Sequence, residues 1–292
     1  MLVTTFLPLV GVVMVTAGVR AVPWRRLPPR VALWTLTSVA VVGSVTVLIA
    51  AAVLAGGFLL ATPVGRWLVD ACSLFAAHHQ VSVAVGLAAS TVLGVVAWRI
   101  GTTLAGEWST RVECDGPLTV LDDAEPIAFA RSGRRGGVVV STGMLDVLEP
   151  AERRVLFAHE RAHVRARHDV HLLLHRLAAA TLPWLGALGD EVRLATERAA
   201  DAAALAEVNG DRRLVATAIA RAALASDRHG TAAPALAFNG GPVSYRVQSM
   251  LQPAGRAALP ASVTGMLGLV GALAATVFVH HVATLLEHIC LS

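Results

Sequence analysis

The sequence predicts a multi-pass α-helical membrane protein that also carries a mostly helical domain with a small β-sheet. Composition indicates the membrane part, because 55% of the 292 residues are hydrophobic and only 15% are charged, with a mean hydropathy of +0.64. An ordinary soluble protein has a larger share of charged residues. The apolar residues gather in four long stretches, and most of the charged residues lie between the third and the fourth. That intervening segment is expected to form the separate domain.

The four apolar stretches are each long enough to cross a hydrocarbon core about 30 Å thick. In chain order they cover about Leu2–Val19, Val31–Leu54, Val81–Trp98 and Ala261–Leu285. Arginines follow the first stretch and none precedes it, so we interpret it as a retained anchor, with a cleaved signal peptide as the alternative. We therefore expect three transmembrane helices with short loops in 1–101, a cytoplasmic domain in 102–255, and a C-terminal transmembrane helix with a short tail in 256–292.

The distribution of arginine predicts how the chain is oriented. All 24 basic residues are arginine, and four lie between the first two apolar stretches: Arg20, Arg25, Arg26 and Arg30. Because short basic loops stay in the cytoplasm, this placement predicts a cytoplasmic 102–255 domain and puts both termini outside. The pI is about 9.7, but the arginines form no basic stripe with interleaved aromatic residues, so direct nucleic-acid binding is not expected. The lipid bilayer is the expected partner, and the sequence does not determine the oligomeric state.

Residues 159–163 form an H-E-x-x-H motif within a predicted helix. Histidines four residues apart share one helical face, about 5–6 Å apart at Cβ, so His159 and His163 can bind one metal ion. Zinc lowers the pKa of a bound water from about 15.7 towards about 7, and Glu160 is placed to take its proton. The motif predicts one Zn²⁺ per chain, with Glu160 as the catalytic base.

A second predicted helix supplies two carboxylates. Glu197 and Asp201 are four residues apart in an alanine-rich segment without glycine or proline, so they also share a helical face. Glu197 would complete a His2Glu zinc site. Asp201 would accept a hydrogen bond from the far N–H of a zinc-bound histidine. Glu191 is a rival ligand, but no carboxylate follows it four residues later.

The apolar stretch His171–Leu188 tests this arrangement. If it crossed the membrane, Glu197 and His159 would lie on opposite sides of the bilayer and could not share a metal ion. The stretch also contains His175, Arg176 and Pro183, which argue against a span. It is expected instead to form a helix packed under the site, or one lying at the membrane surface.

Residues 149–169, which include the H-E-x-x-H motif, resemble the catalytic segment of the BlaR/MecR-type membrane zinc metallopeptidases. Residues 197–201 resemble their E-x-x-x-D helix, and 241–251 resemble their closing Arg-Val-x-x-(Leu/Met)-Leu segment. The resemblance covers about 118–252 and implies a gluzincin-like zinc metallopeptidase domain, here without the penicillin-binding sensor of antibiotic-sensing relatives. HtpX-type proteases are more distantly similar, and they usually carry a late Thr-His-Pro motif that this sequence lacks.

Two short strands are predicted in the domain, over Leu118–Leu121 and Gly137–Ser141, because both runs are rich in β-branched residues. From Pro150 onward the pattern is helical, including a helix over Arg212–Ala225. By resemblance, 137–145 form an edge strand and the turn after it. A substrate segment is therefore expected to add as a strand beside Val138, Val139, Val140 and Ser141.

Three functions are compatible with these features. The first is an integral membrane zinc-dependent endopeptidase that hydrolyses peptide bonds of a cytoplasmic protein; the resemblance implies a BlaI/MecI-like transcriptional repressor as that protein and a role in signal transduction. The alternatives are an HtpX-like quality-control protease and a non-catalytic signalling scaffold. A scaffold needs neither Glu160 nor a complete ligand set, so the intact motifs argue against it. The group that stabilises the oxyanion is open, with three candidates: His168, Arg198 and Arg246.

Overall fold

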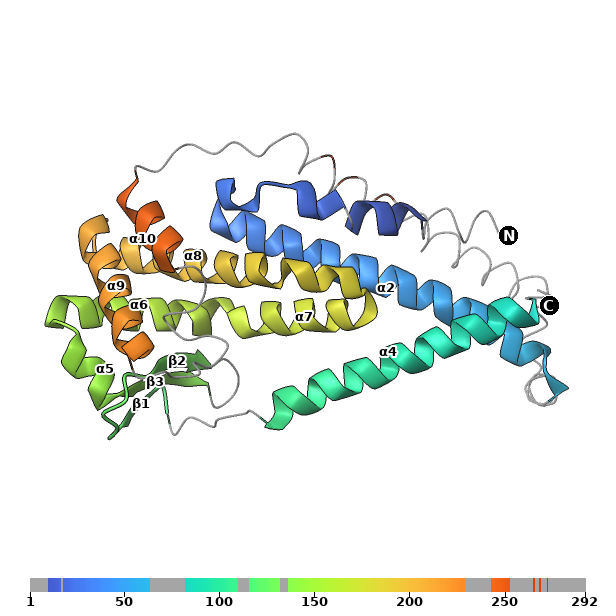
Figure 1. Cartoon of the computed structure of the whole chain (residues 1–292), viewed down its shortest axis with the longest axis horizontal. Helices are drawn as coiled ribbons and strands as arrows, with labels where there is room; N and C mark the ends of the chain where they lie inside the picture. The colour runs from blue at the N-terminus through green and yellow to red at the C-terminus, as the bar shows by residue number, and fades with distance from the viewer. Residues whose placement is uncertain are drawn as a thin grey trace.

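The computed structural model describes residues 10–16, 18–63, 82–109, 116–131, 136–228 and 243–252, and the single residues 265, 268 and 272. The first predicted span lies partly outside these residues, and the fourth lies almost entirely outside them. Within the described part, the molecule is elongated: long helices extend to one side, and a mixed domain with a small sheet lies at the other end (Figure 1).

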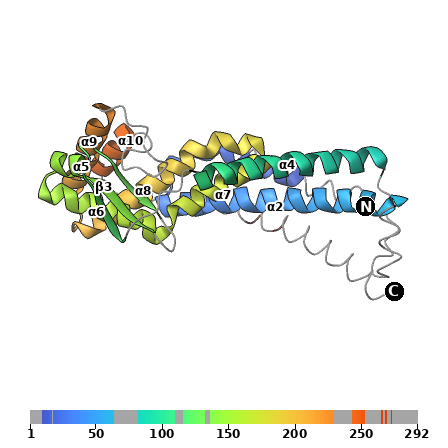
Figure 2. The same ribbon diagram turned by 90° about the horizontal axis from the view of Figure 1, so that it is seen from below.

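Two described helices are long and apolar enough to cross a membrane: α2 (Pro29–Ala61) and α4 (Val83–Ser109). They coincide with the second and third predicted spans, and both are longer than predicted. The two helices pack against each other (Figures 1 and 2). Gly86 of α4 permits this approach, because a Cβ there would clash with the Phe58 side chain of α2. The orientation of these helices in a membrane stays a prediction.

A helical hairpin packs lengthwise against the first half of α2. It consists of α7 (His168–Thr181), the 3-10 helix η3 (Pro183–Leu188) and α8 (Gly189–Glu207). Near its tip, the Ser44 hydroxyl of α2 donates to the Ala178 carbonyl at 3.3 Å. The apolar residues of 171–188 are explained by this packing, since Leu172 and Leu185 are buried in one cluster with α2. As predicted, this stretch is not a long spanning helix.

The sheet has three strands rather than the two predicted: β1 (Leu118–Leu121), β2 (Ala128–Arg131) and β3 (Gly137–Ser141). Their order is β1-β3-β2, with β3 parallel to β1 and antiparallel to β2. The prediction that Val138, Val139, Val140 and Ser141 form an edge strand is therefore wrong. Both sides of β3 already carry a strand, because β2, whose short apolar run was not predicted as a strand, covers its second side.

The remaining helices enclose the sheet and the candidate site. They are α5 (Thr142–Val147), α6 (Pro150–Ala166), α9 (Arg212–Arg228) and α10 (Val243–Leu251). Buried apolar residues of β3, α6 and α9 form a second core, separate from the one between α2 and the hairpin. The two cores meet along α6 and α8, which pack against each other.

Candidate metal centre

Helix α6 presents the H-E-x-x-H residues on its buried face. The helix begins with Pro150, and Glu149 and Glu152 form a capping box at its start. The Glu149 side chain accepts from the backbone N–H of Glu152, and the Glu152 side chain accepts from the backbone N–H of Glu149. Arg221 of α9 donates to the Glu152 carboxylate at 2.8 Å and so fastens this end of the helix. About two and three turns after Glu152, three side chains with 0% exposure point into the domain: His159, Glu160 and His163.

The structure brings His159, His163 and Glu197 together, because α8 packs against α6. The two histidine Nε2 atoms are 3.0 Å apart. The Glu197 carboxylate oxygens lie 3.5 Å from Nε2 of His159 and 3.7 Å from Nε2 of His163. All three side chains are fully buried, and one ligand atom from each lies within 4.8 Å of the others.

These distances fit a zinc ion. Tetrahedral Zn²⁺ with ligands at about 2.0–2.1 Å separates neighbouring ligand atoms by about 3.3 Å. The observed separations of 3.0, 3.5 and 3.7 Å bracket that value. Two imidazoles and one carboxylate are also the ligand set of hydrolytic zinc sites that leave one position open. His159, His163 and Glu197 are therefore able to hold zinc with little rearrangement.

Asp201 and Arg246 support His159 on the side of its ring that faces away from the other two cluster residues. The Asp201 carboxylate lies 3.0 Å from Nδ1 of His159, close enough to hold a proton on that nitrogen, which leaves Nε2 for a metal ion. Arg246 of α10, 0% exposed, donates from Nε and Nη2 to Asp201 at 2.8 and 2.6 Å. Its Nη1 lies 2.9 Å from a Glu197 oxygen. One buried guanidinium thus orients both carboxylates of the E-x-x-x-D helix.

His168 orients His163 in the way that Asp201 orients His159. The sequence did not predict this role for His168. Its Nδ1 lies 2.9 Å from Nδ1 of His163. In a continuous helix, residues five positions apart point about 140° away from each other. Here Arg167 adopts φ 50°, ψ 49° between α6 and α7, and this left-handed residue turns His168 back onto His163. Burial lowers the pKa of His168 to about 3, so the neutral ring can accept the His163 N–H.

Replacing His168 is expected to weaken zinc binding. His168→Phe keeps a ring but removes the acceptor, and losing such a partner costs about 10–100-fold in metal affinity. His168→Asn retains a carbonyl acceptor and should lose less. Zinc affinity measured by competition with a chelator gives the comparison. Equal affinity for the wild type and the phenylalanine variant would contradict the role assigned to His168.

Glu160 lies beside the cluster, and its carboxylate is both buried and without a hydrogen-bond partner among the described residues. Burial raises the pKa of Glu160 to about 8, against the opposing positive charges of His159 and Arg246. A cation held by the three ligands would add positive charge nearby and favour the ionised carboxylate. Glu160 is thus placed to exchange a proton with a water at the metal.

Zinc binding should depend on pH through His159. Burial alone would lower the pKa of this histidine, but its hydrogen bonds to Asp201 and Glu197 raise it to about 9. Below that pH zinc must displace one proton, so its apparent affinity should rise about tenfold per pH unit and level off above about pH 9. In Asp201→Asn the plateau should begin at lower pH. Chelator competition at several pH values measures both curves, and a flat wild-type curve would contradict the prediction.

The other sequence-predicted residues have different positions. Glu191, the rival ligand, is paired with Arg25 at 2.9 Å and is not part of the cluster. Among the three oxyanion candidates, Arg198 donates to the Leu27 carbonyl at 3.1 Å. His168 and Arg246 are engaged behind the metal ligands, as described above. All three therefore have structural partners, and none is assigned to the oxyanion.

Residues 104–235 match peptidase family M48. The match includes α6 and α8, and with the buried His-His-Glu cluster it indicates a metalloprotease. A protein described as a protease HtpX homolog, from Dictyoglomus thermophilum, is 36% identical over 78 residues, which are 26% of this chain and 25% of that protein. The chain thus spans about a quarter of the length of this curated relative. No solved structure matches.

These similarities support the HtpX-like side of the resemblance. The predicted membrane metallopeptidase class agrees with the M48 match and with the two long apolar helices. The narrower BlaR/MecR-type assignment receives no support from them, and the HtpX-like alternative fits at least as well. The absence of a Thr-His-Pro motif, which favoured the BlaR/MecR-type family, therefore does not decide between the two.

Proposed function

We propose that this protein is a membrane-bound zinc endopeptidase that cuts protein segments close to the membrane surface. The observation that carries the proposal is the buried cluster of His159, His163 and Glu197 beside a Glu160 carboxylate without a hydrogen-bond partner among the described residues. A purely structural cluster would pair that carboxylate, because an unsatisfied buried acceptor costs about 1–3 kcal/mol. Hydrolysis explains why it is kept.

Side chains of this protein would bind the metal ion, transfer the proton and orient the ligands. His159, His163 and Glu197 would hold zinc, which when bound polarises a peptide carbonyl and makes an attacking water more acidic. Glu160 would accept the proton of that water and return it to the leaving amine. Asp201 and His168 would keep both imidazoles in the tautomer that binds through Nε2, and Arg246 would hold the two carboxylates in place.

A substrate strand would have to pair with an outer strand of the sheet, since β3 is central. We assign this role to β2, because β2 packs against α6 whereas β1 lies on the far side of β3 (Figure 1). An extended segment beside Ala128–Arg131 would pair through main-chain hydrogen bonds, as many protease substrates do. This replaces the pairing expected beside Val138–Ser141.

The position of the hairpin tip, where α7 ends and α8 begins, indicates where the surface of the bilayer would lie. Beyond the level of the tip, residues 45–61 of α2 and 83–98 of α4 contain no charged side chain. At 1.5 Å per residue they are about 25 and 24 Å long, close to the thickness of a hydrocarbon core. The first charged residue of α4 is Arg99, which donates to the Ala179 carbonyl of the hairpin at 3.4 Å. The bilayer would therefore begin where the hairpin ends.

With this proposed boundary, the candidate site would lie near the lipid surface. Helix α8 leaves the tip at Gly189, and Glu197 follows eight residues later, which is about 12 Å along the helix. A polypeptide that emerges from the bilayer would reach the site within a few residues. Membrane proteins with a cytoplasmic juxtamembrane segment are thus the first substrate candidates, in line with the quality-control alternative predicted from the sequence.

A BlaI/MecI-like repressor is the second candidate substrate. The features that favour it are the match of 241–251 to the closing segment of the BlaR/MecR-type family and the missing Thr-His-Pro motif. A soluble repressor would have to reach a site beside the membrane, and its cleavage would occur in a folded cytoplasmic protein rather than next to a span.

The test compares cells that express the wild type with cells that express Glu160→Gln, with new protein N-termini mapped by mass spectrometry. Glu207→Gln, an exposed carboxylate at the end of α8, is the matched control and should behave like the wild type. We expect cuts that depend on Glu160 and lie close to transmembrane segments of several proteins. Cuts confined to one DNA-binding repressor would favour the second candidate, and identical N-termini in all three strains would refute the endopeptidase proposal.

A further inference from the structure

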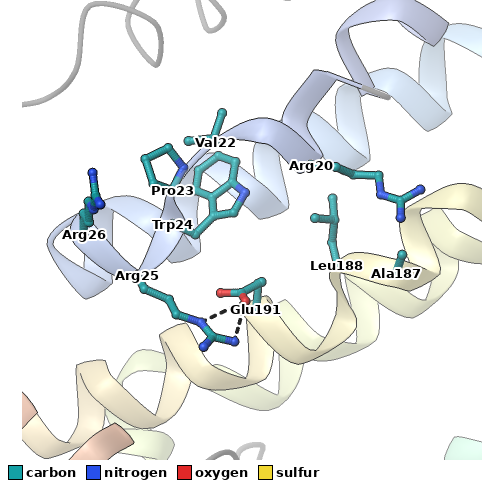
Figure 3. A pocket seen from close by; sticks show the side chains of 9 residues that line it. All are labelled: Arg20, Val22, Pro23, Trp24, Arg25, Arg26, Ala187, Leu188 and Glu191. Atoms are coloured by element: carbon teal, nitrogen blue, oxygen red, sulfur yellow. Dashed lines mark hydrogen bonds and ion pairs between the residues drawn. The ribbon is translucent and has the colours of Figure 1, made fainter. Parts of the chain in front are cut away.

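A pocket of about 510 Å³ lies between the segment 20–26 and the tip of the hairpin. Figure 3 shows Arg20 beside Ala187 at one end and Arg25 directed at Glu191 at the other. The segment links the N-terminal apolar residues to α2, and the opposite wall is the last turn of η3 and the first turn of α8. The pocket is distinct from the metal centre, since it contains none of the metal-centre residues.

The charge of the pocket favours an anion. Three arginines (Arg20, Arg25, Arg26) and one acidic residue (Glu191) line it, which gives a net charge of 3 − 1 = +2. Glu191 is bound by Arg25 through Nε and Nη2 at 3.1 and 2.9 Å. Arg20 and Arg26 are exposed, and within the described part of the chain no acidic side chain is paired with either. The guanidinium groups of Arg20 and Arg26 are therefore available to bind a ligand with phosphate-like geometry.

The wall of the pocket is apolar. Trp24 is 4% exposed, and its indole N–H is already used by the Val19 carbonyl at 2.9 Å. Leu188, 5% exposed, lies opposite, and both residues belong to the core formed with α2. A cationic rim over an apolar wall suits an amphipathic anion better than a free inorganic ion.

We propose that this pocket binds the phosphate headgroup of an anionic phospholipid in the adjacent leaflet. Leu188 ends the hairpin tip, and Arg99, the first charged residue of α4, contacts the hairpin at Ala179, so the pocket lies near the level where the uncharged part of α4 begins. Headgroup phosphates are found at that depth, just outside the hydrocarbon core. The inference rests on the membrane boundary argued above and does not depend on peptidase activity.

The pocket also adjoins the helix that carries a metal ligand. Glu191 lies six residues before Glu197 on α8, and a phosphate in the pocket would compete with Glu191 for Arg25. Removing the competing carboxylate should therefore strengthen lipid binding, whereas removing the two unpaired arginines should weaken it.

The test uses the full-length protein carrying Glu160→Gln, so that hydrolysis cannot affect the outcome. Binding of phosphatidylglycerol and of phosphatidylcholine is measured by native mass spectrometry of the detergent-solubilised protein. Each arginine near a membrane surface contributes about 1 kcal/mol of attraction to anionic lipid, so Arg20→Gln/Arg26→Gln should lower the phosphatidylglycerol affinity about 25-fold. Glu191→Gln should raise it, and phosphatidylcholine should bind weakly in every variant.

The matched control is Arg154→Gln/Arg161→Gln, two arginines from a different pocket beside α6. It removes the same charge and should retain the preference for phosphatidylglycerol. An unchanged preference after loss of Arg20 and Arg26 would overturn the proposal, and so would displacement of the lipid by millimolar inorganic phosphate, which would indicate a site for a free anion. Zinc content, measured in parallel, should be equal in all variants and shows that the metal centre is intact.

Discussion

Glu160→Gln is expected to slow peptide-bond hydrolysis by several orders of magnitude while zinc remains bound. The amide has nearly the same shape as the carboxylate but cannot accept the proton of an attacking water. A general base typically contributes about 10²–10⁴-fold to rate, and loss of that order is the expected result. Because Glu160 is not one of the three ligands, the zinc content after purification should equal that of the wild type.

The complementary variant is Glu197→Gln, which removes a ligand and leaves the base. It should lose both activity and most of the zinc, because a His2Glu site depends on all three ligands. Metal content measured by atomic spectroscopy, alongside hydrolysis of a peptide pool, separates the two effects. Retained activity in Glu160→Gln would show that another group acts as the base and would refute its assignment.

Arg246→Met should produce a large loss of stability. The guanidinium is fully buried and is paired with Asp201 and Glu197. Removing one partner from a buried charge network leaves the others uncompensated, at a cost of about 3–5 kcal/mol. Bound zinc would return positive charge to Glu197, so the loss should be smaller in zinc than in a chelator. Thermal unfolding of the detergent-solubilised protein under both conditions measures it.

Two further variants distinguish the stability lost with an exposed ion pair from the stability lost with the buried charge network. Arg161→Met breaks an ion pair with Glu207 whose side chains are 44% and 51% exposed, and it should cost no more than about 1 kcal/mol. Adding Asp201→Asn to Arg246→Met removes one of the stranded charges and should recover part of the stability. A loss for Arg246→Met as small as that for Arg161→Met would mean that the buried network does not stabilise the fold.

Local sequence patterns were sufficient to predict which residues form the cluster that could hold a metal ion. His159 with His163 and Glu197 with Asp201 are each four residues apart, so helical periodicity alone places each pair on one face. Long uncharged stretches likewise predicted α2 and α4, because their length and apolar content are typical of long membrane-spanning helices. The two strands richest in β-branched residues were also predicted within their observed bounds.

Non-local pairing decided the features that were predicted wrongly or not at all. The position of β3 in the sheet depends on β2, a run of only four residues that pairs antiparallel with β3. His168 depends on the left-handed Arg167, since a continuous helix would turn it away from His163. The role of Arg246 depends on α10, which packs against α9 and brings Arg246 to Asp201 and Glu197 on α8, although α10 is distant from α8 in the sequence.

The sequence by itself determined the chemistry of this protein: which residues can bind zinc, which one can act as base, and which segments are apolar enough for a membrane. These properties follow from residue type and helical spacing, and both are local. Only the tertiary structure decided which strands form the outer edges of the sheet, which groups lie behind the two histidines, and which elements pack around the cluster. Those properties arise from contacts between residues distant in the chain, whose geometry no local pattern contains.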